Sequence, residues 1–314
     1  FSTIAEKTGL KIELINKGVW NFYPTITYSN SNVIIKKKNI SLSIKNINIH
    51  INKSYWPLSP VLINLNSPTV NYKGMEMRNA ILQAKYANNT IYIESLTGNI
   101  IEGNIQVKGN IELDDKQPFA IQGHFDNISL NTLFEQSQVA SWGRINIKLS
   151  SPNFKISGKG NGDQDWTNSL TGTFPIKGSL YFTSTDEERF GAALLSLLVE
   201  KIPSLTNISQ SVNFLLSTYA NVPSSLNGNL TLKDGSITSK EILITNKEGK
   251  SILKGSYSFI ENTINGTIYF YEQNEIFLEA SLQGAIENPQ ILVAGKLFSD
   301  QEEQPTQDIK QLFE

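Results

Sequence analysis

The 314-residue sequence has no cysteine and only two histidines, which excludes several kinds of chemistry. Without cysteine there is no disulfide scaffold, thiolate zinc site or thiol nucleophile. His50 and His124 leave little for imidazole acid–base or metal chemistry, and both fall at polar positions of alternating segments, where we expect them to face solvent. P-loop, nucleophile-elbow and zinc-protease motifs are missing as well. The sequence therefore predicts a protein that is not an enzyme, with no catalytic residue, metal or cofactor.

A basic excess and a long apolar run are also missing. The formal net charge is −2 and the pI is about 5.9, whereas nucleic-acid binding usually needs a basic face, so we expect no nucleic-acid partner. A membrane-spanning helix needs roughly 18 apolar residues, and the longest apolar stretch, 190–199, is shorter. The chain starts at Phe1 without a methionine. We interpret it as an ectodomain of a longer precursor.

Period-two alternation is the dominant pattern that is present. In residues 101–113 every odd position is Ile, Val, Leu or Gly and every even position is polar, which is typical of a strand with one apolar face. Similar alternation occurs near residues 47–51, 91–93, 230–232, 242–244, 264–270 and 276–282. Short turn sequences separate these runs, so we expect sequential antiparallel pairing.

Local irregularities add detail to this sheet. The parity of the apolar residues changes between Leu42-Ile44 and Ile47-Ile49, which predicts a bulge near Lys45. Glycines recur inside the strands, at Gly98, Gly103, Gly109, Gly228, Gly255, Gly266 and Gly284. Such glycines mark places where a sheet bends or where another group approaches closely. The predicted fold is mainly β, a long curved antiparallel sheet that forms a groove or an open barrel.

Two helices are expected to interrupt this sheet. Thr185 with Glu188 forms a capping-box pattern at the start of a helix that runs to Lys201, with an apolar stripe of Phe190, Leu194, Leu197 and Leu198. A second helix is predicted over residues 208–220, with Ile208, Val212, Leu215 and Tyr219 on one face. The pair could act as a lid or plug.

The chain divides into five predicted segments. They are an N-terminal β region (1–140), middle strands (141–184), the helical pair (185–222), a C-terminal β region (223–298) and a polar tail (299–314). Within the middle segment, Asp163-Gln-Asp165 resembles part of a calcium loop, but the glycine and distal glutamate of such a loop are out of register. We therefore favour a polar hairpin loop there.

The apolar faces of the strands need a cover, because burying one Ile or Leu side chain contributes roughly 1.5–3 kcal/mol. Either the sheet closes on itself as a sandwich, or it curls around a groove that holds a ligand. Alternation alone favours the closed core.

The order of several motifs resembles the bacterial AsmA family. The segment from Thr8-Gly9 to Phe22-Tyr23-Pro24 is similar to the start of that family. Pro68-Thr-Val70, the strand from Glu102 to Gly109, and Phe125-Asp-Asn-Ile-Ser-Leu130 follow in the family's order. Residues 226–255, and the chain from there to Val293-Ala-Gly295, are similar to its C-terminal region. The apolar helix around Phe190 departs from the pattern.

The resemblance implies a periplasmic protein that is anchored to the inner membrane of a Gram-negative-type bacterium by a segment before Phe1. It also implies kinship to bridge-like lipid-transfer proteins, and hence an apolar β-groove that holds phospholipid acyl chains and supports phospholipid transport and outer-membrane homeostasis. The candidate groove residues are Ile101, Ile105, Val107, Ile111, Leu230, Leu232, Ile242, Ile244, Tyr257, Phe259, Ile264, Ile268, Phe270, Ile276, Leu278 and Leu282.

A second role is compatible with the same resemblance. The protein could be a non-enzymatic scaffold that assists the assembly or insertion of outer-membrane proteins, using an exposed edge strand for β-augmentation. Its partners would then be outer-membrane proteins or other envelope factors.

Overall fold

The computed structural model describes residues 11–22, 26–37, 40–51, 61–72, 75–131, 145–160, 163–183, 206–272, 274–285 and 290–294. These residues form 17 strands and two helices. The strands are β1 (Lys11–Leu14), β2 (Val19–Asn21), β3 (Ile26–Lys37), β4 (Ile40–Ile51), β5 (Val61–Tyr72), β6 (Met75–Ala87), β7 (Thr90–Ile100), β8 (Gly103–Glu112), β9 (Phe119–Ser129), β10 (Ile145–Gly158), β11 (Thr171–Phe182), β12 (Ser224–Lys233), β13 (Ser236–Thr245), β14 (Lys250–Ser258), β15 (Thr263–Glu272), β16 (Glu275–Ala285) and β17 (Gln290–Ala294). The helices are α3 (Asp163–Ser169) and α5 (Thr206–Tyr219).

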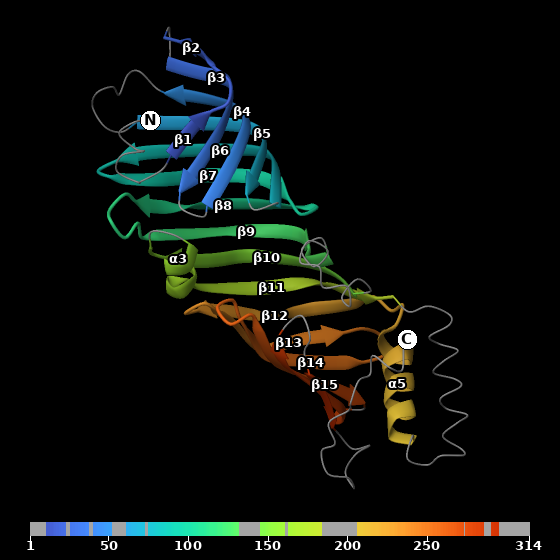
Figure 1. Ribbon diagram of the computed structural model, residues 1–314. Coiled ribbons are helices and arrows are strands. Elements are labelled where there is room, and N and C mark those ends of the chain that lie inside the picture. The colour runs from blue at the N-terminus through green and yellow to red at the C-terminus, as the bar shows by residue number, and fades with distance from the viewer. Residues whose placement is uncertain are drawn as a thin grey trace. The chain divides into compact units, whose positions relative to one another are not determined.

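The predicted fold class is confirmed. The chain is mainly β, and its strands form one long antiparallel sheet that, in the described part of the chain, does not close into a barrel. Strands that follow one another in the sequence are paired from β3 to β9 and from β13 to β17 (Figure 1). Short turns connect most of these pairs, as the sequence predicts.

The chain forms two compact units, each built from separate stretches of sequence. Unit 1 comprises Phe1–Ile128, Ser150–Phe174 and Thr231–Gly235, and unit 2 comprises Ser129–Leu149, Pro175–Leu230 and Ser236–Glu314. Unit 1 contains β1 to β8, most of β9 and α3. Unit 2 contains α5 and β13 to β17.

The first strands of unit 1 pack their own apolar side chains into a core. Tyr28, Val33 and Ile44 from β3 and β4 are buried together, and partly buried apolar residues of β1 and β5 pack against them. The predicted bulge is confirmed, because Ser31 pairs with Ile47 but Val33 pairs with Ile44, which leaves one extra residue in β4. This end of the sheet has a closed core.

Turns explain two differences from the predicted strands. The strand predicted over residues 101–113 begins only at Gly103. Ile101 and Glu102 form the turn between β7 and β8, with positive φ angles of 48° and 63°. This conformation is rare for a β-branched residue. Phe259 lies in the turn after β14 and is 47% exposed. Neither residue is part of a strand face.

Helix α3 replaces the polar hairpin loop that we favoured at Asp163–Asp165. It lies between β10 and β11 at one end of these strands (Figure 1). The Trp166 ring packs edge-on against Phe119, with 6.3 Å between the ring centroids, and its Nε1 donates to the Gly160 carbonyl oxygen at 2.8 Å. The aromatic anchor stabilises a helical turn where the polar sequence alone favours a loop.

Helix α5 confirms the second predicted helix. No helix in the described part of the chain is both long enough and apolar enough to cross a membrane. The predicted first helix, including Phe190, Leu194, Leu197 and Leu198, lies outside the described residues, and so does the polar tail.

Candidate functional site

The sixteen candidate groove residues divide between the two units. Five belong to unit 1, namely Ile101, Ile105, Val107, Ile111 and Leu232. Eleven belong to unit 2, namely Leu230, Ile242, Ile244, Tyr257, Phe259, Ile264, Ile268, Phe270, Ile276, Leu278 and Leu282. The two groups are therefore treated as separate surfaces.

In unit 1, strands β8 and β9 place their apolar side chains on a single face. Ile105 pairs with Phe125, Gly109 with Ile121 and Ile111 with Phe119. These inward side chains are half-buried, whereas their neighbours along the strands, such as His124, are exposed. Water therefore still reaches part of this apolar face.

A row of aromatic rings continues the face across three strands. Phe125 of β9 lies 5.9 Å from Phe154 of β10, and Phe154 stacks on Phe174 of β11 with centroids 5.8 Å apart and planes at 17°. Phe154 is buried, while Phe125 and Phe174 are half-buried. We call Ile105, Ile121, Phe125, Phe154 and Phe174 the inner apolar face of unit 1.

The sequence did not single out this aromatic row. In β10 the inward positions change parity, since Ser151 and Phe154 are buried and both residues between them are exposed. Because of this shift, the sequence of β10 does not show a regular alternation of apolar and polar residues. In β9 the odd positions Phe119, Ile121 and Phe125 alternate with Ala120, Gln122, His124 and Asp126, and this signal could have found them.

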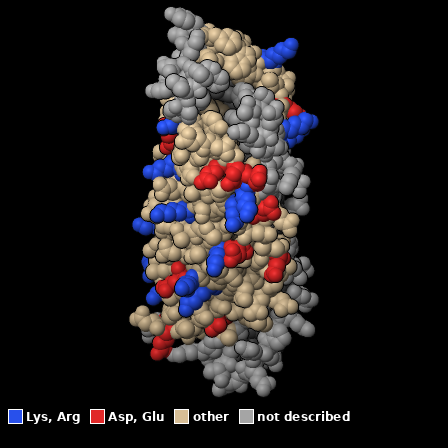
Figure 2. All heavy atoms as spheres, turned by 90° about the vertical axis from the view of Figure 1, so that its left-hand side faces the viewer, with Lys and Arg blue, Asp and Glu red and all other residues tan. Residues whose placement is uncertain are grey.

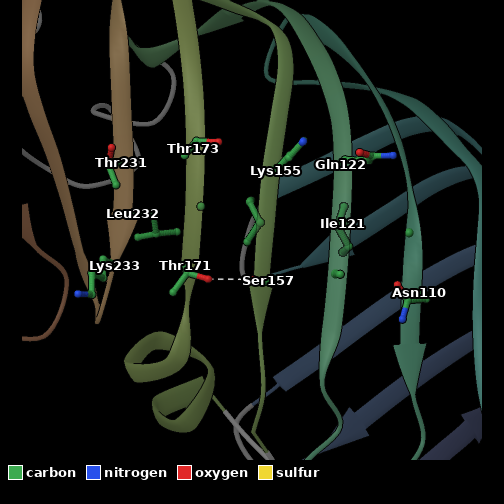
Figure 3. Close-up of a pocket in the computed structure, with 14 residues that line it drawn as sticks. Asn110, Ile121, Gln122, Lys155, Ser157, Thr171, Thr173, Thr231, Leu232 and Lys233 are labelled. Atoms are coloured by element: carbon green, nitrogen blue, oxygen red, sulfur yellow. Dashed lines mark hydrogen bonds between the residues drawn. The ribbon is translucent and has the colours of Figure 1, made fainter.

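A hollow of about 650 Å³ also lies in unit 1, and its lining residues come from five strands, β8 to β12 (Figure 3). Ala120, Gln122, Lys155, Ser157, Thr171, Thr173, Thr231 and Lys233 are exposed positions of their strands, and Gly109, Asn110, Ile121, Ile156, Gly172 and Leu232 complete the lining. Ser157 and Thr171 share a hydrogen bond of 2.8 Å between their hydroxyl groups. The lining contains two lysines and no acidic residue, which suits an anionic group.

Of the candidate groove residues, the lining of this hollow includes only Leu232. Ile105, Val107 and Ile111 lie on the apolar side of β8, where Val107 is buried and the other two are half-buried. The hollow therefore adds polar and basic groups near the strands that carry the inner apolar face. It does not join the predicted residues into one channel.

In unit 2, aromatic side chains of helix α5 pack against β15 and β16. Phe214 lies 4.5 Å from Phe277 of β16, and Tyr219 meets Phe270 of β15 edge-on at 5.5 Å. The Tyr219 hydroxyl group is hydrogen-bonded to Ser251, and burial raises the pKa of Tyr219 above its usual range. Phe270 therefore contacts the helix rather than an open groove.

The other candidates of unit 2 range from buried to exposed. Leu278 is only 1% exposed, Ile242 and Ile244 are also buried, and Ile276 at the start of β16 is 39% exposed. Leu230, Tyr257, Ile264, Ile268 and Leu282 are half-buried. The buried members belong to the core of unit 2.

Polar side chains show little sign of a reactive centre in the described part of the chain. There, no group of three or more acidic or histidine side chains is placed to hold a metal ion. His50 and His124 are exposed, as predicted. Asp163 and Asp165 belong to the first turn of α3. On the face drawn in Figure 2, basic and acidic side chains are interspersed.

Comparisons with protein-family models, with curated proteins and with solved structures found no match for this chain.

Proposed function

We propose that the chain is a periplasmic, AsmA-like protein that holds phospholipid acyl chains against the inner apolar face of unit 1 and so supports phospholipid transport and outer-membrane homeostasis. One observation supports this proposal most directly. Ile105, Ile121 and Phe125 occupy inward strand positions, yet they remain half-buried. A ligand that covers them would remove apolar surface from water, with a gain of roughly 25 cal/mol per Å².

The energetic requirement of lipid transport fits such a surface. Exposing an acyl chain of ~16 carbons to water costs on the order of 13 kcal/mol, at about 0.8 kcal/mol per CH₂ group. A continuous apolar face can offset much of this cost without a catalytic residue. Lys155 and Lys233 are exposed positions next to inward residues of their strands, so they lie on the opposite side of the sheet and the proposal does not rely on them.

The test is capture of phospholipid by the purified chain. Organic extraction followed by mass spectrometry should detect co-purified lipid, and the chain should capture a fluorescently labelled phosphatidylglycerol. Ile121→Gln and Phe125→Gln each place an amide on the inner apolar face, so we expect at least a tenfold loss of captured lipid. His124→Gln is the matched control, because His124 is an exposed residue of the same strand; it should capture as the unmodified chain does.

Circular dichroism and cooperative unfolding should be the same for all three variants before their capture is compared. Absence of lipid in the extract, together with no capture by the unmodified chain, would overturn the proposal. Equal capture by all three variants would exclude the inner apolar face as the site.

A further inference from the structure

The segment from the end of β1 to the residue after β2 carries several exposed apolar side chains. Leu14, Ile15, Val19, Trp20 and Phe22 are each between 45% and 61% exposed, and we call these five residues the apolar tip. All three residues of β2 are exposed. Single exposed apolar residues are normal, but five of them within residues 14–22 are typical of a segment that interacts with another surface.

The tip is held in place by β3. The backbone N–H of Ile15 donates to the Asn32 carbonyl oxygen at 2.9 Å, and the Ser31 hydroxyl donates to the Asn16 carbonyl oxygen at 3.1 Å. The Gly18 N–H donates to the Tyr28 hydroxyl at 3.2 Å. These bonds fix the turn from Ile15 to Gly18 against β3, and with it the ends of β1 and β2 that carry the other tip residues.

The aromatic members of the tip are organised too. Trp20 stacks on Phe22, with centroids 5.9 Å apart and planes at 10°, and it contacts the Tyr28 ring at 4.6 Å. Tyr28 itself is buried. A buried ring thus supports one side of Trp20, while the indole remains 45% exposed.

The charge of this part of the sequence is strongly positive. From Leu14 to Met75 there is no Asp or Glu, while there are seven lysines, Lys17, Lys36, Lys37, Lys38, Lys45, Lys53 and Lys73. Because the whole chain carries −2, the remaining residues sum to −9. Glu13 pairs with Lys11 at 3.0 Å and with Lys36 at 2.9 Å, and these pairs lie next to the tip on β1 and β3.

We infer that the apolar tip inserts into the interfacial region of a membrane that is rich in anionic lipid. Tryptophan prefers this region because its ring has an apolar body and a polar N–H group, and phenylalanine is common among the apolar side chains that insert there. Lysines near an anionic membrane surface add electrostatic attraction. Three of the five tip residues are aliphatic, and aliphatic side chains offer no stacking surface to a nucleic-acid base, so the composition favours lipid over single-stranded nucleic acid.

This inference goes beyond the proposed function and uses different residues. The 314-residue chain is mixed with vesicles of phosphatidylglycerol and phosphatidylcholine, or of phosphatidylcholine alone, and binding is measured by flotation. We expect binding to the mixed vesicles that falls at least tenfold in a Trp20→Ser/Phe22→Ser variant and several-fold in Lys17→Glu. Ile81→Ser is the matched control, since Ile81 is 46% exposed in the same unit, and it should bind as the unmodified chain does.

The absence of cysteine allows a direct measure of insertion. A single Val19→Cys variant with an environment-sensitive NBD label should show brighter, blue-shifted emission on mixed vesicles, whereas a label at Ile81→Cys should not change. Ile121→Gln should still bind vesicles, and Trp20→Ser/Phe22→Ser should still capture lipid, so failure of one proposal is distinguishable from failure of the other. Unchanged emission at residue 19, equal flotation of the Trp20/Phe22 variant, or binding of a single-stranded oligonucleotide in place of vesicles would overturn the inference.

Discussion

At the scale of single residues, glycine decides how closely neighbouring strands approach. The close contacts expected from the strand glycines are confirmed at Gly103 and Gly109, where an added Cβ would overlap the carbonyl oxygens of Asp126 and Ala120. They are not found at Gly284, which has open space and a φ of +100°. Periodicity predicts that these glycines occupy the apolar positions of their strands. Whether a Cβ there would overlap the backbone depends on where the neighbouring strand lies.

Gly109→Ala tests this close approach. We expect it to destabilise unit 1 by about 1–3 kcal/mol, because overpacking against backbone atoms forces the strands apart. Gly158→Ala is the control in the same unit, since an added Cβ there meets only side-chain atoms, the nearest being Phe119 Cε1 at 3.0 Å. Urea denaturation should show a clearly smaller loss for Gly158→Ala. A similar loss for both variants would contradict the steric explanation.

At the scale of elements, the position of α5 depends on one asparagine in the turn between β13 and β14. Asn246 Nδ2 donates to the Thr218 carbonyl oxygen at 2.9 Å and to Ser224 Oγ at 3.0 Å. Its Oδ1 accepts from the backbone N–H groups of Glu248 and Gly249, both at 2.8 Å. One side chain therefore links the end of α5 to the turn and to the start of β12.

Asn246→Ala removes all four of these hydrogen bonds. At roughly 0.5–1.5 kcal/mol net for each bond, we expect unit 2 to lose about 2–6 kcal/mol of stability and the amides of α5 to exchange faster with solvent. Lys247→Ala is the neighbouring control, because its ion pair with Glu248 is exposed and such pairs contribute little. Unchanged exchange in α5 after Asn246→Ala would show that aromatic packing alone holds the helix.

Sequence patterns predicted elements better than they predicted the site. The strands, the second helix and the bulge in β4 follow from apolar periodicity and its parity. Alternation does not reveal where a strand gives way to a turn, as at Ile101, or where a nearby ring stabilises a helix, as Trp166 does on Phe119. It also cannot tell which apolar side chains are covered, such as Phe270, which the Tyr219 ring of α5 meets edge-on.

At the scale of the whole molecule, the division into two units predicts separate responses to ligand. If phospholipid binds the inner apolar face, it stabilises unit 1, by about 2.7 kcal/mol when free ligand is at a hundred times Kd. Calorimetry should then show an upward shift of the unit 1 transition alone. Asn246→Ala identifies the unit 2 transition, since that variant lowers it selectively.

Phe125→Gln should abolish the shift of the unit 1 transition. An upward shift of the unit 2 transition alone would place the ligand among the apolar residues of that unit instead.

Pairing between sequence neighbours also affects how the molecule is made and how it can change over generations. Each strand from β3 to β9 finds its partner in the residues that have just left the ribosome or are about to leave it. Local contacts of this kind carry a small loop-closure cost and favour fast folding. Insertion of one more hairpin in the gene would lengthen such a sheet without disturbing the pairing already present, so relatives with more or fewer strands could arise by simple duplication or loss.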